Sequence, residues 1–367
     1  MKNKQKTVSE EENDGQFSWY SLSGPYDDVI LSTRVRLARN LADFLFPDRL
    51  NDDDRMSVLS LVYDSFAGNP LYHFIYTSNV PAKSRQILLD KNYLAPGKKC
   101  DAFVLGLGNC SDSFCAVNSC DHIRISNFTA GLDCERAMQN AYKIDEMLQE
   151  KLQFAASYEF GYLTSQIKDC GSGLKISFRC FIPSIVLSGE LKKVSELLEK
   201  QRFCIKPVFK SHDTANFSNC LFDIYTSSSF EGTELDQMAA IQSVGMLIFK
   251  TERKIRKNFA DNNPTVVLNF VKQSYARSMY AMLLDYEESV DIICAIKWGL
   301  HTGIIEGILE NELNSLFYRI KSGQLEFLCD NFQFTFESDI ASDMNLKIKR
   351  LRATVIQQAF EKLSFKS

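Results

Sequence analysis

Three arginines close together in one short segment are the first residues in this sequence that could do chemistry. Arg34, Arg36 and Arg39 end the segment 27–39, which begins with an apolar, β-branched run. A cluster of this kind is usually a solvated face, and the alternative is a local basic pocket. The choice between the two depends on the motifs that accompany the arginines.

A second candidate is Cys120, because His122 follows it two residues later. Residues i and i+2 on a strand share a face, so a cysteine nucleophile paired with this histidine is geometrically allowed. Asp121 is an alternative base, although one residue along a strand points to the opposite face. We favour neither arrangement, because His122 also fits a motif described below.

Eleven cysteines are spread along the chain, and none belongs to a CxxC pair. The odd count and the missing close pairs argue against a zinc site or a disulfide framework. Cys110, Cys115 and Cys120 are evenly spaced, but strand alternation would place Cys115 opposite the other two. The sequence therefore predicts buried, reduced thiols and no metal site.

The overall composition is that of a folded protein with a nearly balanced charge. The 367 residues are 45% apolar, and 42 Lys and Arg stand against 46 Asp and Glu, for a net charge of −4. This balance argues against a nucleic-acid partner, and we find no apolar run of about 18 residues that would cross a membrane. The N-terminus has no apolar signal-peptide core, so we expect a cytoplasmic protein.

Hydrophobic periodicity predicts an α+β part followed by an all-α part. Residues 1–22 resemble a polar tail, and the Asn-rich stretch 258–264 is a predicted linker between domains over 23–255 and 260–367. After it, nearly every segment of 265–362 has helical period. Earlier helices are predicted over 52–67, 134–160, 192–201 and 237–258, and strands over 102–107, 114–117, 122–126, 173–185, 203–209 and 220–226.

The arginine segment belongs to a longer series of motifs. Ser32–Asn40 (STRVRLARN), followed by Phe46-Pro47, resembles the opening signature of the ATP:guanido phosphotransferases, and of the bacterial protein arginine kinases in particular. The resemblance covers about residues 27–365 and continues in order with Asn118, DHIR at 121–124, GYLTS at 161–165, GSGLK at 171–175, ESVDII at 288–293 and KWGLHTG at 297–303. It implies a phosphagen-kinase-like catalytic domain with a mostly antiparallel sheet flanked by helices, followed by an all-α C-terminal domain.

The family resemblance implies transfer of the γ-phosphoryl group of Mg-ATP to a guanidinium nitrogen. A guanidinium is a poor nucleophile, because it is protonated and its lone pairs are delocalised. The reaction therefore needs carboxylates that orient the acceptor and help to remove a proton. It also needs a cationic cradle for the charge on the transferred group.

The implied cradle keeps its positive charge. The resemblance assigns Arg34, Arg36 and Arg124 to the phosphates, whereas Lys175 and Lys206 stand where the family has arginine and so lack its bidentate fork. A family histidine beside the nucleotide is replaced by Asn92. The other residues of the implied nucleotide site are Ser32, Thr33, Val35 and Ser177.

The implied acceptor site is not kept. Cys120 stands where the family has a catalytic carboxylate, Gln166 where it has a loop cysteine, and Ser211 near its second carboxylate. Loss of a positioned base alone lowers a rate by roughly 10²–10⁴. We expect a protein that binds ATP with impaired or no phosphoryl transfer, acting as a regulator or adaptor in bacterial protein quality control. The alternative is an active arginine kinase with a divergent acceptor site.

The resemblance also implies partners: a second copy of this chain, a small zinc-binding activator protein and a Clp-type ATPase. In the C-terminal part, a phosphoarginine-binding motif of the protein arginine kinases survives only as Arg352 and Ala353. The basic run of Lys347, Lys349, Arg350 and Arg352 is typical of a solvated helix face.

Overall fold

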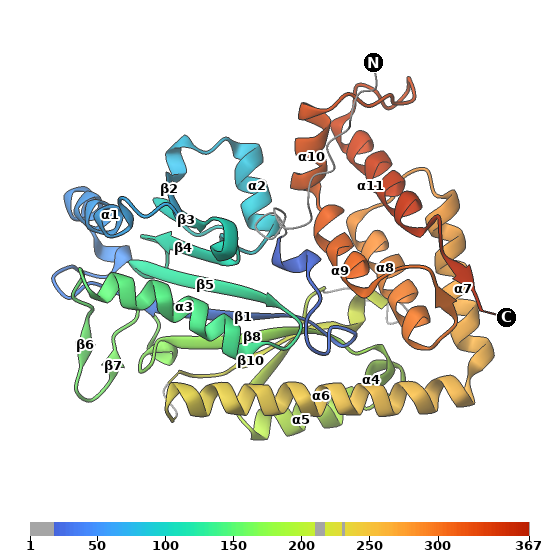
Figure 1. Ribbon diagram of the computed structural model, residues 1–367, viewed down its shortest axis with the longest axis horizontal. Helices are drawn as coiled ribbons and strands as arrows, with labels where there is room; N and C mark the ends of the chain where they lie inside the picture. Colours follow the sequence, from blue (N-terminus) through green and yellow to red (C-terminus); the bar gives the residue numbers. More distant parts are fainter. Residues whose placement is uncertain (1–17, 210–216, 230–231, 367) are drawn as a thin grey trace, which may run out of the picture.

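The computed structural model describes residues 18–209, 217–229 and 232–366, and an antiparallel sheet forms its centre. Helices flank the sheet, and the C-terminal helices lie together at one end of it (Figure 1). This confirms the predicted α+β class. Its eight strands lie in the order β2-β3-β4-β5-β1-β8-β10-β9. They are β1 Ile30–Arg39, β2 Tyr72–Tyr76, β3 Ala102–Gly106, β4 Ser113–Val117, β5 Ile123–Ala130, β8 Leu174–Phe181, β9 Phe203–Pro207 and β10 Leu221–Thr226.

The helices divide into those that flank the sheet and those of a helical region, which we define as α7 to α11. In the part of the chain that the structure describes, no helix is long and apolar enough to cross a membrane. Two-residue strands form two small pairs, β6 Ala156–Ser157 with β7 Gly161–Tyr162 and β11 Ile305–Glu306 with β12 Ser364–Phe365. The helices are α1 Asp52–Phe66, α2 Ala82–Asp90, α3 Cys134–Gln149, α4 Pro183–Leu187, α5 Leu191–Lys200, α6 Glu234–Asn262, α7 Pro264–Tyr280, α8 Tyr286–His301, α9 Glu310–Arg319, α10 Ser322–Asn331 and α11 Met344–Phe360.

Strand β1 lies in the middle of the sheet and separates a core face from an open face. Val35 and Leu37 are fully buried, whereas Arg34 and Arg36 between and beside them are partly exposed. Side chains alternate along a strand, so the two arginines share the open face. The core face packs against α3 and α6 through Ile125, Ile176, Ile224, Ala137, Ala141, Ile144, Ile241 and Val244.

Two predictions of helix ends are wrong. Helix α3 ends at Gln149 rather than near residue 160, because the chain beyond it bonds elsewhere: the Ala155 N–H donates to Asn40 O at 2.7 Å. The predicted linker 258–264 is mostly the last turns of α6, and only Asn263 separates it from α7. Pro264 disfavours helical geometry at Asn263 and is itself suited to the first helical position, so the break is one residue long.

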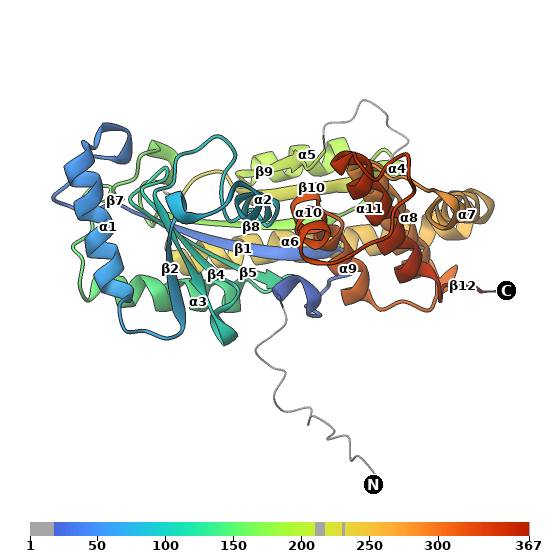
Figure 2. The same cartoon turned by 90° about the horizontal axis from the view of Figure 1, so that it is seen from above.

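Contacts at several places tie the helical region to the sheet and to the helices that flank it. Helix α10 lies beside α2 (Figure 2), where Lys83 pairs with Asp330 at 2.7 Å and the Gly323 N–H donates to Asp90 Oδ2 at 2.9 Å. Lys297 of the KWGLHTG motif is fully buried, and its Nζ donates to the backbone oxygen of Asp27 at 2.9 Å, just before β1. These contacts hold the helices against the strand that carries the arginines.

Candidate functional site

Four cationic side chains gather on the open face of the sheet. Arg36 of β1 lies directly across the strand pair from Lys175 of β8. On the other side of β1, Arg124 of β5 lies across from Ala38, two residues beyond Arg36. Opposed residues of an antiparallel pair share a face, so the strand register brings Arg34, Arg36, Arg124 and Lys175 together.

These side chains line a hollow of about 310 Å³ and an adjoining recess of about 170 Å³. Arg34, Arg36 and Asn92 line both, and Arg124 lines the recess. We call the two together the cationic hollow. Of the other residues that the resemblance assigns to the nucleotide, its lining includes Ser32, Ser177 and Lys206.

The electrostatics of the hollow favour a bound anion. Burial lowers the pKa of Arg34 well below its ordinary range, burial and Arg124 lower that of Arg36 to about 10, and burial and Arg36 lower that of Lys175 to about 8. Within the described residues these three side chains make no ion pair, and the buried Nε atoms of Arg34 and Arg36 have no hydrogen-bond partner. An anion would supply both the missing charge and the missing acceptors.

Three of the assigned nucleotide residues need a separate description. Asn92 follows α2 with a φ of 59°, a left-handed conformation that asparagine tolerates better than most residues. Thr33 and Val35 lie on the core face of β1, and both are fully buried. The Thr33 hydroxyl donates to Gly131 O at 2.7 Å. Their side chains therefore do not reach the hollow.

The structure adds residues that sequence reasoning missed. Arg179 and Asp223 line the hollow and form a bidentate pair at 2.8 and 3.0 Å. Burial acts to lower the pKa of Arg179, but Asp223 outweighs it and the pKa is raised. Arg179 follows Lys175 by four residues, and alternate residues of a strand share a face. The sequence could therefore have placed Arg179 on the same face as Lys175. Tyr318 of α9 also lines the hollow, and no local pattern indicates it.

Arg39, the third arginine of the cluster, has a structural role. It is fully buried, pairs with Asp145 of α3 at 2.9 Å and lies 3.7 Å from the centre of the Tyr162 ring. Its Nη1 donates to Ser172 O at 2.9 Å. Arg39 thus joins β1 to α3 and to the loop before β8, away from the cationic hollow.

The contacts of His122, in the turn between β4 and β5, argue against a nucleophile in which this histidine activates Cys120. The Leu41 N–H donates to His122 Nδ1 at 3.0 Å, and His122 Nε2 lies 2.9 Å from Leu45 O, which assigns the proton to Nε2. Both ring nitrogens are therefore engaged, and burial lowers the pKa of His122. Asp121 is buried and accepts from Asn40 Nδ2 and the Ser165 N–H, so it holds the 161–165 loop rather than serving as a base.

Two of the three residues that the resemblance assigns to altered acceptor positions lie together. Cys120 and Gln166 line a pocket of about 480 Å³, which we call the turn pocket, and Ser119 lines both this pocket and the recess of the cationic hollow. Ser211 lies outside the described residues. Asp169, at the end of the same loop, acts to raise the pKa values of Arg36 and Lys175 against the effect of burial. A carboxylate therefore lies close enough to the cationic hollow to act on the charges of Arg36 and Lys175, although it does not line the hollow or the turn pocket.

The cysteines and the C-terminal basic residues have structural surroundings. Among the described residues, no group of three His, Cys, Asp or Glu side chains could hold a metal ion, and Cys115 is buried in the core. Arg352 is also buried, and it donates to the backbone oxygens of Ile320 and Leu284, each at 2.8 Å. It joins α11 to the segments before α10 and α8, so the prediction of a solvated face is wrong for Arg352. Lys349 and Arg350 beside it pair with Asp285 and Glu337.

The antiparallel sheet and its cationic open face define an α+β protein with a site suited to an anion. The family model of the ATP:guanido phosphotransferase C-terminal catalytic domain matches residues 59–255, more than half of the chain. The chain therefore belongs to the ATP:guanido phosphotransferase family, whose members use ATP with Mg²⁺. Strand β1 and the helical region lie outside the matched segment.

Within the family, the chain is similar to proteins named protein-arginine kinase. The one from Halothermothrix orenii is 27% identical over 314 residues, 84% of this chain and 89% of the relative. The one from Bacillus subtilis is 24% identical over 323 residues, 85% and 87% of the two chains. Solved structures support the fold: lombricine kinase superposes with a TM-score of 0.53 at 15% identity, covering 65% of this chain and 68% of that one. The duplicated taurocyamine kinase from Schistosoma mansoni, solved with components of a transition-state analogue, gives 0.55 at 17%, covering 72% and 41%.

Proposed function

We propose that this protein binds Mg-ATP in the cationic hollow and that its transfer of the γ-phosphoryl group to a guanidinium is impaired or absent. One contrast between adjoining pockets carries the proposal. The cationic hollow keeps Arg34, Arg36 and Arg124 on one face, whereas the turn pocket has Cys120 and Gln166 at the positions implied for a carboxylate and a thiol.

The residues of the hollow fit a triphosphate. The Nε atoms of Arg34 and Arg36 are buried and lack acceptors, and phosphate oxygens are strong acceptors for guanidinium donors. Lys175 and Lys206 add point charges without the fixed geometry of a fork. Mg²⁺, when bound, neutralises part of the phosphate charge, and the protein's own side chains hold and orient the phosphates.

The turn pocket does not fit a guanidinium acceptor in the manner of the family. At the positions that the family resemblance implies, the amide of Gln166 and the thiol of Cys120 are weak partners for a cation, and neither orients it with a bidentate contact. The carboxylates that line the turn pocket, Asp48 and Asp52, share it with the cations Arg55, Lys98 and Lys99. In this proposal the protein does not phosphorylate arginine. It acts as a regulator or adaptor in protein quality control whose interactions with other proteins depend on bound nucleotide.

A second candidate function is an active arginine kinase with a rearranged acceptor site, and Asp169 is the observation that favours it. The charge of this carboxylate acts to raise the pKa values of Arg36 and Lys175. Among the described residues, Asp169 has no ion-pair partner. It belongs to the loop whose Gln166 lines the turn pocket. In this alternative, Asp169 pairs with the acceptor guanidinium in place of the missing carboxylate.

Two measurements on the same preparation test the proposal. Calorimetry with Mg-ATP should show salt-sensitive binding that Arg34→Ala or Arg124→Ala abolishes, whereas Arg277→Ala, at an exposed arginine of α7, should leave it unchanged. Incubation with labelled ATP and an arginine-rich acceptor should yield no phosphoarginine. Robust phosphorylation by the unmodified chain that disappears in Asp169→Asn would establish the second candidate instead.

A further inference from the structure

The helical region reaches into the cationic hollow through Tyr318. This residue lies in α9, outside the segment matched by the family model, yet it lines the hollow with Ser32, Arg179 and Asp223. Burial raises its pKa to about 12, so its hydroxyl stays protonated at neutral pH. The wall of the hollow is therefore built by two separate parts of the chain.

Tyr318 lies at the end of the hollow away from the main cluster of charges. Along β1, Ser32 lies across from Arg179 and Arg36 lies across from Lys175. At a rise of about 3.3 Å per residue, Ser32 and Arg36 are about 13 Å apart. An extended nucleotide with its phosphates at the Arg36 end would place its base near Ser32 and Tyr318.

The other aromatic rings of the hollow are less suited to contact a base. The Lys175 Nζ lies 4.6 Å from the centre of the Tyr225 ring, which places Tyr225 at the cationic end. The Arg34 guanidinium lies 4.9 Å from the centre of the Phe128 ring and covers it. Phe178 is buried in the core, and Tyr93 of the recess is stacked on Phe114 with centroids 4.9 Å apart. Of the rings that line the larger hollow, Tyr318 is the one that we place at the far end from Arg36 and Lys175.

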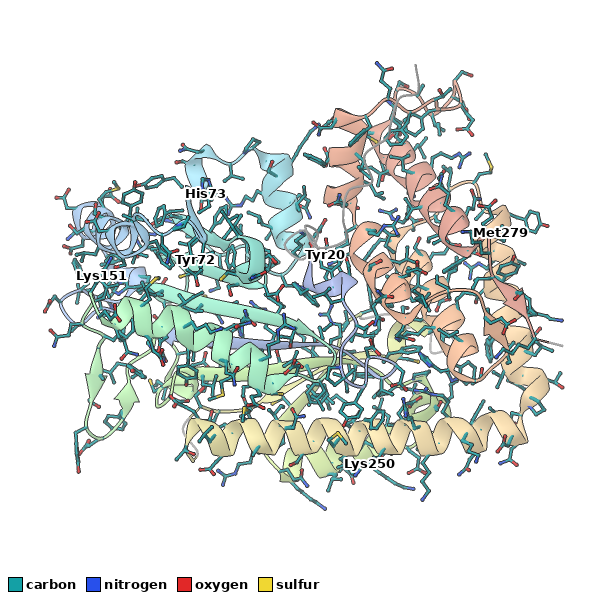
Figure 3. The ribbon with its side chains drawn as sticks, in the orientation of Figure 1. Tyr20, Tyr72, His73, Lys151, Lys250 and Met279 are labelled. Atoms are coloured by element: carbon teal, nitrogen blue, oxygen red, sulfur yellow. The ribbon has the colours of Figure 1, made fainter. Side chains whose placement is uncertain are left out.

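The ring of Tyr318 is held firmly in place. Tyr20 stacks on it with centroids 4.5 Å apart and planes 17° apart, and Trp19 meets it edge-on at 5.2 Å. The Lys321 Nζ also lies 5.9 Å from the centre of the ring, so the part of Tyr318 that lines the hollow is the part available to a ligand. Trp19 in turn stacks on Phe128 at 5.3 Å. Figure 3 shows Tyr20 at the junction of the sheet with the helical region. A ring fixed by packing contacts a base with little further loss of side-chain entropy.

The helical region also contacts the segment that carries Asn92, another residue lining the hollow. Three residues after Tyr318, Lys321 donates from Nζ to Asp90 O at 2.5 Å. Asp90 ends α2, and Asn92 of the hollow follows two residues later. Tyr318 and Asn92 are therefore connected through a short chain of contacts made by the helical region.

We infer that Tyr318 contacts the nucleobase, so that the helical region makes the cationic hollow selective for a nucleotide over a bare polyphosphate. This inference rests on the proposed function, because it assigns the base end of the same ligand. Stacking on an aromatic side chain strengthens binding of a base substantially and is tolerant of which base it is. Binding of the phosphates depends on the arginines, so removal of the Tyr318 ring should not change it.

Calorimetry with two probes, Mg-ATP and inorganic tripolyphosphate with Mg²⁺, separates the two ends of the hollow. Tyr318→Leu should weaken ATP binding about tenfold and leave tripolyphosphate binding within about twofold. Tyr318→Phe, which keeps the ring, should bind ATP like the unmodified chain. Arg34→Ala should weaken both ligands. Tyr280→Leu is the matched control, since Tyr280 belongs to the helical region and is 84% exposed, and it should change neither.

The outcomes distinguish this inference from the proposal beneath it. Thermal melts and circular dichroism confirm that each variant is folded, and Tyr318→Phe guards against a purely structural effect. If the unmodified chain binds ATP and tripolyphosphate equally, or if Tyr318→Leu weakens both alike, the base contact is refuted while the cationic hollow stands. If the unmodified chain binds neither ligand, the proposed function falls and this inference falls with it.

Discussion

The charge on Lys175 should make anion binding depend on pH in a range where arginines do not titrate. Burial and the neighbouring Arg36 lower the pKa of Lys175 to about 8. Above that pH the free protein loses one of the charges that line the cationic hollow. A bound phosphate favours the protonated amine, so binding must then take up a proton and becomes weaker as pH rises.

The size of the effect follows from that pKa. With a value of about 8, roughly nine tenths of Lys175 is protonated at pH 7 and roughly one tenth at pH 9. If the bound anion keeps the amine protonated throughout, ATP affinity falls about tenfold over this range, or about 1.4 kcal/mol. Calorimetry in buffers of different ionisation enthalpy would measure both the affinity and the proton uptake.

Lys175→Arg is the matched control, because a guanidinium stays charged throughout this range and is the group that the family resemblance implies at this position. The variant should bind ATP at pH 7 at least as well as the unmodified chain, and its affinity should be nearly constant up to pH 9. A flat profile for the unmodified chain, or an equal decline in the variant, would refute the reasoning.

Three further predictions concern catalysis, stability and the cysteines. Cys120→Glu alone should not produce phosphoarginine, because Gln166 still replaces the loop thiol; mass spectrometry of an incubated acceptor decides this. Arg39→Ala should lower the free energy of unfolding by about 3–5 kcal/mol, since it leaves Asp145 buried without its partner, whereas Arg277→Ala at an exposed pair should lower it by less than about 1 kcal/mol; urea titration compares them. Burial keeps four thiols protonated, those of Cys115, Cys180, Cys220 and Cys294. In the native protein they should resist alkylation at pH 8 and should react only on unfolding; mass spectrometry counts the alkylated thiols.

Much of the fold could be predicted from local patterns. Helix α1 begins where Asn51 caps it and three aspartates follow, and its predicted range of 52–67 differs from the structure by one residue. The alternation of buried and charged residues in β1 is also legible in the sequence. Helix α3 could not be placed at its C-terminal end, because its apolar stripe continues past Gln149 while the backbone there pairs with the segment after β1. Helix α2 and strand β2 were not predicted at all.

The candidate site shows where local information ends. The order of motifs and the family resemblance were enough to single out Arg34, Arg36 and Arg124, because residue type and spacing are local properties. The contacts of Arg39 and His122 could not be predicted from nearby residues, because each is made with a segment more than 40 residues away in the chain. Arg39 pairs with α3, and His122 contacts the segment after β1. Residue type alone cannot distinguish a buried partner from a solvated or reactive one.

By itself, the sequence placed two arginines on one face of a strand and, through the family resemblance, predicted an acceptor position without a carboxylate. Only the tertiary structure decided that Lys175 lies across from Arg36, that Arg179 joins the same face, and that Tyr318 closes the far end. The reason is physical. Side-chain direction along one strand follows from backbone geometry, whereas strand register and helix docking follow from burying a shared core among segments far apart in the chain.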